Sequence, residues 1–233
     1  MEGGSPGTEG EGAAVTGFTG EMPGGVLGGV ALLVGFGVVA AATSTFNIFY
    51  VFLPSHLAAT GRAPLPRALT AALVGLLVSS AVAPVAGRIS DRVGRRPVLL
   101  GGVVGLLLLT VPVFSLVEGG GRGGLVLGYC LMGLALGMLP VSSFLAELFP
   151  TRLRYSGLSL TYGVASALFG GTAPALAVLL VRRTGGALPA AWYASCITAV
   201  AVACVLLAPE TVHRPLDDGI SPDAGGAGSS RRR

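Results

Sequence analysis

Residues 87–97 read G-R-I-S-D-R-V-G-R-R-P, and they lie between two long apolar runs of the chain. In this stretch two glycines allow a tight turn between helices, and four arginines surround a single acid, Asp91. Arginines gathered beside an apolar run are typical of the cytoplasmic ends of membrane-spanning helices. The stretch therefore predicts two membrane spans that are joined by a short polar loop.

Further apolar runs follow on both sides of this loop. A helix needs about 20 apolar residues to cross the hydrocarbon core of a bilayer. Charged residues make up only 11% of the 233 residues, against about 25% in soluble domains, and they fall between the runs. We expect an all-α membrane protein, a bundle of six transmembrane helices at residues 25–53, 66–86, 97–117, 124–146, 155–181 and 187–207.

The two ends of the chain have a different composition from the middle. Residues 1–23 and 211–233 are polar, and the first of these segments is rich in glycine and glutamate. Such segments bury too little apolar surface to fold. The expected organisation is a disordered tail at 1–23, a six-helix domain at 24–210 and a disordered cytoplasmic tail at 211–233.

The arginines also predict the orientation in the membrane. All 15 basic residues are arginine, and with six spans both termini lie on one side. Ten arginines fall on that side, and the other side carries five, namely Arg62, Arg67, Arg122, Arg182 and Arg183. The side richer in arginine is expected to be cytoplasmic. The sequence therefore predicts a multi-pass protein of the cell membrane with both termini in the cytoplasm.

The pattern G-x-x-x-D-R-x-G-R-R closely resembles the cytoplasmic signature of the major facilitator superfamily, which lies between the second and third helices of each six-helix half. A second stretch, A-E-L-F-P-T-R-L-R-Y-S-G at residues 146–157, is similar to the loop before the penultimate helix in metabolite:proton symporters. That branch includes carriers of proline and betaine, α-ketoglutarate and shikimate. P-E-T at residues 209–211 is similar to the P-E-T that follows the last helix in sugar porters and related branches. The chain thus resembles the C-terminal half of a major facilitator fold.

By this resemblance, the residues around the signature form a conformational latch on the cytoplasmic side. The expected latch residues are Gly87, Asp91, Arg92, Gly94, Arg95, Arg96, Glu147, Arg152 and Arg154. We expect Asp91 to contact the N-terminal end of the fifth helix, near Arg154 and Tyr155, because a helix N-terminus favours an acid. Arg92 or Arg95 is expected to pair with an acid such as Glu147.

The resemblance also implies that the first and fourth helices line a central cavity. Polar residues inside membrane spans are functional candidates by default. The candidates for the cavity are Asn47, Tyr50, Tyr129, Tyr162 and Ser166. Helical spacing predicts that Asn47 and Tyr50 share a face, as do Tyr162 and Ser166. The alternative is that these groups only form hydrogen bonds between packed helices.

A small-residue motif, G-L-A-L-G, spans Gly133 to Gly137 in the fourth run. Two glycines at this spacing allow helices to approach closely. We interpret the motif as tight packing within the bundle in preference to a dimerisation motif.

The resemblance implies transport of a small polar metabolite by proton-coupled symport and alternating access. Two alternatives stay open: a truncated or accessory six-helix membrane protein without transport of its own, and a sugar-porter-like half. Because the family has twelve helices, the expected partners are membrane lipid, the solute, and an N-terminal six-helix half or a second copy. The arginines adjoin apolar runs, so nucleic-acid binding is not expected. No catalytic pair and no Cys or His spacing for a metal occurs, so we expect no enzyme, cofactor or metal site.

Overall fold

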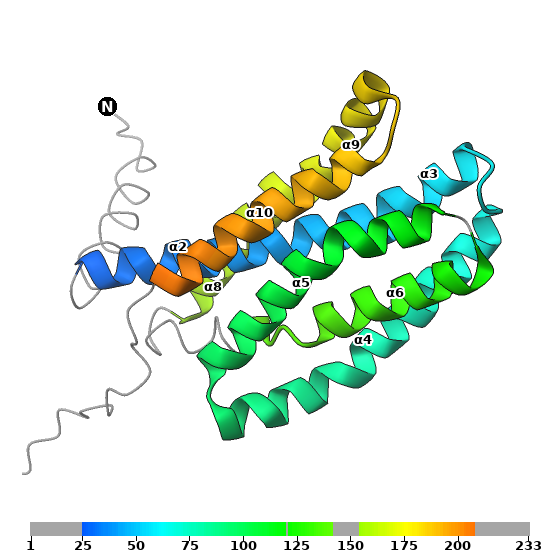
Figure 1. Ribbon diagram of the computed structural model, residues 1–233. Helices are drawn as coiled ribbons and strands as arrows, with labels where there is room; N and C mark the ends of the chain where they lie inside the picture. Colours follow the sequence, from blue (N-terminus) through cyan, green and yellow to red (C-terminus); the bar gives the residue numbers. More distant parts are fainter. Residues whose placement is uncertain (1–24, 120, 142–153, 208–233) are drawn as a thin grey trace, which may run out of the picture.

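The computed structural model describes residues 25–119, 121–141 and 154–207, and all regular structure in these ranges is helical (Figure 1). The first rod is continuous and consists of α2 (Gly25–Phe46), the π-helical segment η1 (Asn47–Phe52) and α3 (Leu53–Ala59). The next three are α4 (Leu65–Val93), α5 (Arg95–Glu118) and α6 (Arg122–Gly137). The fifth consists of α8 (Arg154–Ala165), the π-helical segment η2 (Ser166–Gly170) and α9 (Gly171–Thr184), and the sixth is α10 (Leu188–Leu207).

The described rods have the length and the composition of membrane spans. Five of them are long and apolar enough to cross a bilayer, while α6 is a shorter apolar helix. This confirms the all-α membrane class and the six-helix bundle that the sequence predicts. The two predicted tails, 1–23 and 211–233, lie outside the described residues.

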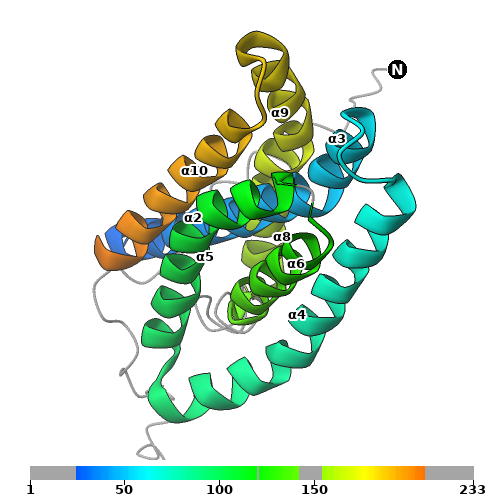
Figure 2. The same ribbon diagram turned by 45° about the vertical axis from the view of Figure 1, so that its right-hand side comes forward.

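Each rod packs against two or more others, and the views in Figures 1 and 2 show the resulting order. The second rod, α4, packs against α6, and α6 packs against α5. The sixth rod, α10, lies between α5 and α2, and α2 also packs against α8 and η2. Large side chains such as Phe49 and Phe114 fill the interior, with their rings in an edge-to-face contact at 5.7 Å.

Glycine brings α4 and α6 into backbone contact. A Cβ placed on Gly133 would lie 2.1 Å from the carbonyl oxygen of Gly75, and one on Gly137 would lie 2.7 Å from that of Ser79. A Cβ on Gly75 would in turn lie 2.5 Å from the carbonyl oxygen of Tyr129. Only glycine fits such positions. The G-L-A-L-G motif is therefore a packing contact within the chain, as the sequence predicts.

The structure changes the expected boundaries of three spans. In the second span α4 continues to Val93, beyond the expected end at residue 86. The first rod continues to Ala59, beyond the expected end at residue 53. Its polar side chains bond back to the preceding turn, as Asn47 does to the Thr43 carbonyl at 2.9 Å and Ser55 does to that of Val51 at 3.3 Å. Such bonds satisfy polar groups within a helix. In the fourth rod α6 ends at Gly137, and the rest of the expected span, from residue 142, lies outside the described residues.

Candidate functional site

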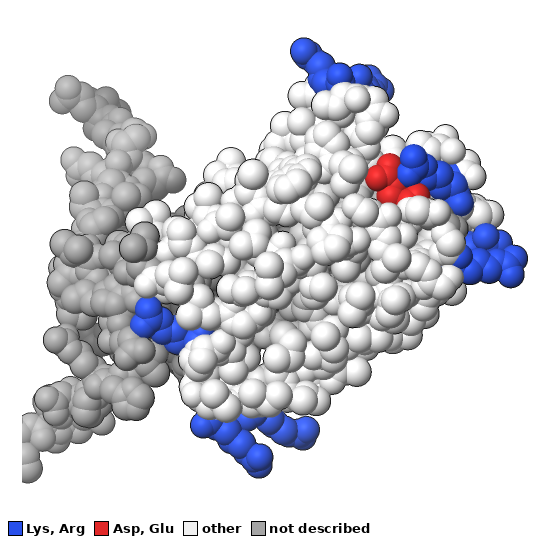
Figure 3. Space-filling model, viewed as in Figure 1, with Lys and Arg blue, Asp and Glu red and all other residues white. Residues whose placement is uncertain are grey.

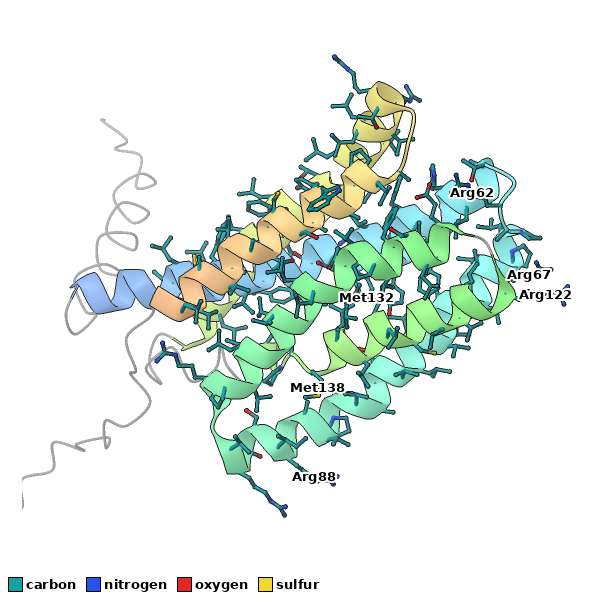
Figure 4. All side chains as sticks on the ribbon, viewed as in Figure 1. Arg62, Arg67, Arg88, Arg122, Met132 and Met138 are labelled. Atoms are coloured by element: carbon teal, nitrogen blue, oxygen red, sulfur yellow. The ribbon has the colours of Figure 1, made fainter. Side chains whose placement is uncertain are left out.

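Charged side chains lie at the ends of the bundle. The face in Figure 3 shows Arg, Asp and Glu at its rim, around a broad middle without charge. In Figure 4, Arg62, Arg67 and Arg122 gather at one end, and Arg88 lies at the other end of α4. We call the end formed by residues 87–97 the motif end, and the end with Arg62 and Arg122 the opposite end.

At the motif end the predicted loop is almost entirely helical. The helix α4 continues to Val93, α5 begins at Arg95, and Gly94 alone joins them. Gly94 has φ +105°, a value that non-glycine residues rarely adopt. The expectation that Gly87 helps to make this turn is wrong, because Gly87 lies inside α4, where a Cβ would meet nothing within 4 Å.

The side chain of Arg96 crosses from the first turn of α5 to the end of α10. Its Nη2 donates to the carbonyl oxygen of Leu206 at 3.3 Å. The last carbonyls of a helix lack partners within the helix, and a cation near them is favoured by the helix dipole. Arg96 therefore connects the third rod to the sixth.

The remaining contacts of the predicted latch stay predictions. Asp91 and Arg92 are exposed in the last turn of α4. Glu147 and Arg152 lie outside the described residues, as do the side chains of Arg95, Arg154 and Tyr155.

At the opposite end an ion pair is present that sequence reasoning missed. Arg62 Nη1 lies 2.8 Å from Glu118 Oε1 and donates to the Glu118 carbonyl oxygen at 2.9 Å. The turn before α4 aims this arginine, because the backbone N–H groups of Arg62 and Ala63 both donate to the carbonyl of Leu57. The pair connects the end of the first rod to the end of α5. The sequence offered one signal for this pair. Arg62 and Glu118 carry opposite charges and lie near span ends that are predicted to be on the same side of the membrane.

In the middle of the bundle, Tyr50 of η1 and Tyr129 of α6 lie together. Their ring centroids are 5.6 Å apart, and Tyr50 Oη donates to the Tyr129 carbonyl at 3.5 Å. Both side chains are buried, and the Tyr129 hydroxyl has no hydrogen-bond partner in the described part of the chain. The first and fourth rods therefore meet at two candidate residues, which lie inside the bundle and not on its exposed surface.

Asn47 lies beside the fifth rod instead. A Cβ on Gly170 of η2 would lie 3.2 Å from Asn47 Nδ2, and Ser44 Oγ donates to the nearby Phe169 carbonyl at 3.5 Å. The expectation that Asn47 and Tyr50 share a face is wrong. They lie in a π-helical segment, whose i→i+5 turn is wider than an α turn, so residues three apart point in different directions.

The other two candidates differ in exposure. Tyr162 of α8 is 48% exposed, whereas the Ser166 hydroxyl at the start of η2 is buried and has no partner among the described residues. Sequence reasoning missed the two π-helical segments and Gly170, for which spacing and composition offered no signal.

Comparisons with known proteins give one family and several relatives. The family described as Sugar (and other) transporter matches residues 26–219. Over 187 residues the chain is 31% identical to the ectoine/proline transporter ProP of Corynebacterium glutamicum, covering 79% of this chain and 37% of the relative. It is 31% identical over 198 residues to the proline/betaine transporter of Escherichia coli K12, covering 83% of this chain and 39% of the relative. It is 32% identical over 166 residues to the citrate-proton symporter of Salmonella typhi, covering 68% of this chain and 37% of the relative. The chain thus spans under two-fifths of the length of these curated relatives.

Proposed function

Because this chain belongs to the sugar (and other) transporter family of the major facilitator superfamily, we propose that it forms the C-terminal half of a transporter for a small polar metabolite. The observation that carries the proposal is the match over residues 26–219, which covers all six described rods. Relatives in this match are named as transporters of ectoine, proline and betaine and as a citrate-proton symporter. The solute is accordingly a zwitterion or an organic acid, moved by alternating access.

The middle of the bundle supports a neutral polar contribution to the solute site. Asn47, Tyr50 and Tyr129 come from the first and fourth rods, and polar groups at this depth are costly unless they serve packing or a ligand. In the described spans the acids are Asp91 and Glu118, which lie in the last turns of α4 and α5. In this proposal the carboxylate that couples transport to protons belongs to the partner half.

The partner in this proposal is an N-terminal six-helix half, or a second copy of the chain, in the cell membrane. Both termini lie in the cytoplasm, as the ratio of ten arginines to five supports. The latch in this proposal comprises the residues of the motif end together with Glu147, Arg152 and Arg154.

A chimera tests the proposal. The N-terminal half of the E. coli proline/betaine transporter is fused to residues 25–233, and uptake of labelled proline and glycine betaine is measured with and without a protonophore. We expect uptake that the protonophore abolishes. Uptake that the protonophore leaves unchanged contradicts symport, and a chimera that reaches the membrane but takes up neither solute contradicts this solute class.

The rival proposal is an accessory six-helix protein that transports nothing itself. An active chimera would exclude loss of function in these six helices.

A further inference from the structure

Asn47 is the only carboxamide side chain of this protein, because the sequence contains no other asparagine and no glutamine. It lies at the start of η1, near the middle of the first rod, where α2 and η1 pack against the fifth rod. It is half-buried. A carboxamide both donates and accepts hydrogen bonds, so its orientation decides which atom it presents.

The hydrogen bond to Thr43 determines that orientation. The Thr43 carbonyl can only accept, so the atom 2.9 Å from it is the amide nitrogen of Asn47. None of the hydrogen bonds among the described residues ends at Asn47 Oδ1, and the side chain is half-buried, so this acceptor is open to a donor from outside them.

Gly170 holds the amide from the other side. A Cβ at this position would lie 3.2 Å from Asn47 Nδ2 and 3.4 Å from the Thr43 Cβ. The first distance is shorter than an ordinary van der Waals contact and the second is an ordinary one, so an alanine methyl group would press on the amide, which must shift by a few tenths of an ångström. In the same rod Gly163 has open space, with nothing within 4 Å of its Cβ position.

We propose that Gly170 is a positioning residue that acts through Asn47: it fixes the carboxamide so that Oδ1 accepts a hydrogen bond from an N–H group of the solute. This rests on the proposed function and narrows it, because proline and ectoine carry an N–H donor and glycine betaine, a quaternary ammonium, carries none. The chain therefore selects for donor-bearing zwitterions at this position.

The single carboxamide makes the orientation measurable. The full chain is labelled with ¹⁵N-asparagine and placed in lipid nanodiscs, where NMR shows one side-chain NH₂ pair. We expect Gly170→Ala to shift this pair and Gly163→Ala to leave it unchanged. Equal shifts in both variants, or none in Gly170→Ala, would overturn the positioning role.

A double variant covers the case in which Gly170→Ala folds poorly. If the methyl group presses on the amide, removing the amide relieves it, so the loss of thermal stability caused by Gly170→Ala becomes smaller in an Asn47→Ala background. An equal loss in both backgrounds contradicts the contact.

Competition for uptake by the chimera tests recognition, because its second half completes the site. We expect Gly170→Ala in the chimera to weaken the apparent affinity for proline roughly fivefold, the equivalent of one hydrogen bond, and to leave the affinity for glycine betaine unchanged, while Gly163→Ala changes neither. Equal losses for both solutes, or no loss for proline, overturn donor recognition. Failure of the proposed function is read separately, from an unaltered chimera that takes up neither solute.

Discussion

The glycines of this chain differ in whether their backbone conformation and their neighbours exclude a side chain. Gly94 alone connects α4 to α5 and has φ +105°, whereas Gly87 lies seven residues earlier inside α4 with open space at its Cβ position. Both belong to the same sequence signature, so their roles separate only in the structure.

We predict opposite effects of alanine at these two positions. Gly94→Ala forces a side chain into a left-handed backbone and costs about 1–3 kcal/mol of stability. Gly87→Ala removes a helix-interior glycine and gains about 0.5–1 kcal/mol. Thermal unfolding in detergent micelles measures both changes. Destabilisation of equal size in both variants would contradict the assigned backbone roles.

Arg62 carries the second residue-scale prediction. Its partner Glu118 has a side chain that is only 13% exposed, against 45% for Arg62. Because the pair is partly solvated, a double-mutant cycle with Arg62→Ala and Glu118→Ala should give a coupling of about 0.5–1 kcal/mol. The same cycle with Arg67→Ala, an exposed arginine of α4, should give none. Equal coupling in the two cycles would refute the assigned pair.

At the scale of elements, the contact between α4 and α6 depends on backbone approach. The Cβ position of Gly133 lies 2.1 Å from the Gly75 carbonyl oxygen, whereas that of Gly105 on α5 has nothing within 4 Å. The two glycines are both in helix interiors, and they differ in what they face.

We therefore expect Gly133→Ala to force the two helices apart and to cost at least about 1–3 kcal/mol, as overpacking does. Gly105→Ala should be neutral or slightly stabilising. Unfolding midpoints of the two variants in the same detergent give the comparison. A stable Gly133→Ala chain with an unchanged midpoint would mean that α4 and α6 are not in backbone contact.

Elements were predictable from the sequence where the signal is local. Runs of apolar residues located the six rods, because hydropathy and length are properties of each segment. The Gly133–Gly137 motif predicted close packing because the spacing of its glycines is also a property of a single segment. The π-helical segments and the Gly170 contact had no local signal in the sequence. The charges of Arg62 and Glu118 indicated only that two span ends lie on one side, and not that these ends become neighbours. The prediction that Asn47 and Tyr50 share a face was wrong because it assumed α-helical spacing, whereas η1 is a π-helix with a wider turn.

At the scale of the whole molecule, the two sides of the protein differ in their number of arginines. Arg88 lies at the motif end, while Arg62, Arg67 and Arg122 gather at the opposite end (Figure 4). Counted over the whole sequence, the side of the motif end has ten arginines and the other has five. This asymmetry sets the orientation that we expect in the membrane.

We predict that the motif end faces the cytoplasm. In a background without Cys130, Cys196 and Cys204, a cysteine at Arg122 should react with an impermeant maleimide added outside intact cells. A cysteine at Arg88 should react only after the cells are opened. Labelling of both sites from outside would contradict the predicted topology.

The central proposal is that this chain is one half of an alternating-access transporter. One bundle supplies one wall of a site that lies between two bundles. The direct measurement is proton-driven proline uptake in proteoliposomes that contain the purified chain, at a measured oligomeric state, with and without a co-reconstituted N-terminal six-helix half. We predict uptake only when a second bundle is present, either that half or a second copy. Robust gradient-driven uptake by a demonstrated monomer would contradict the claim.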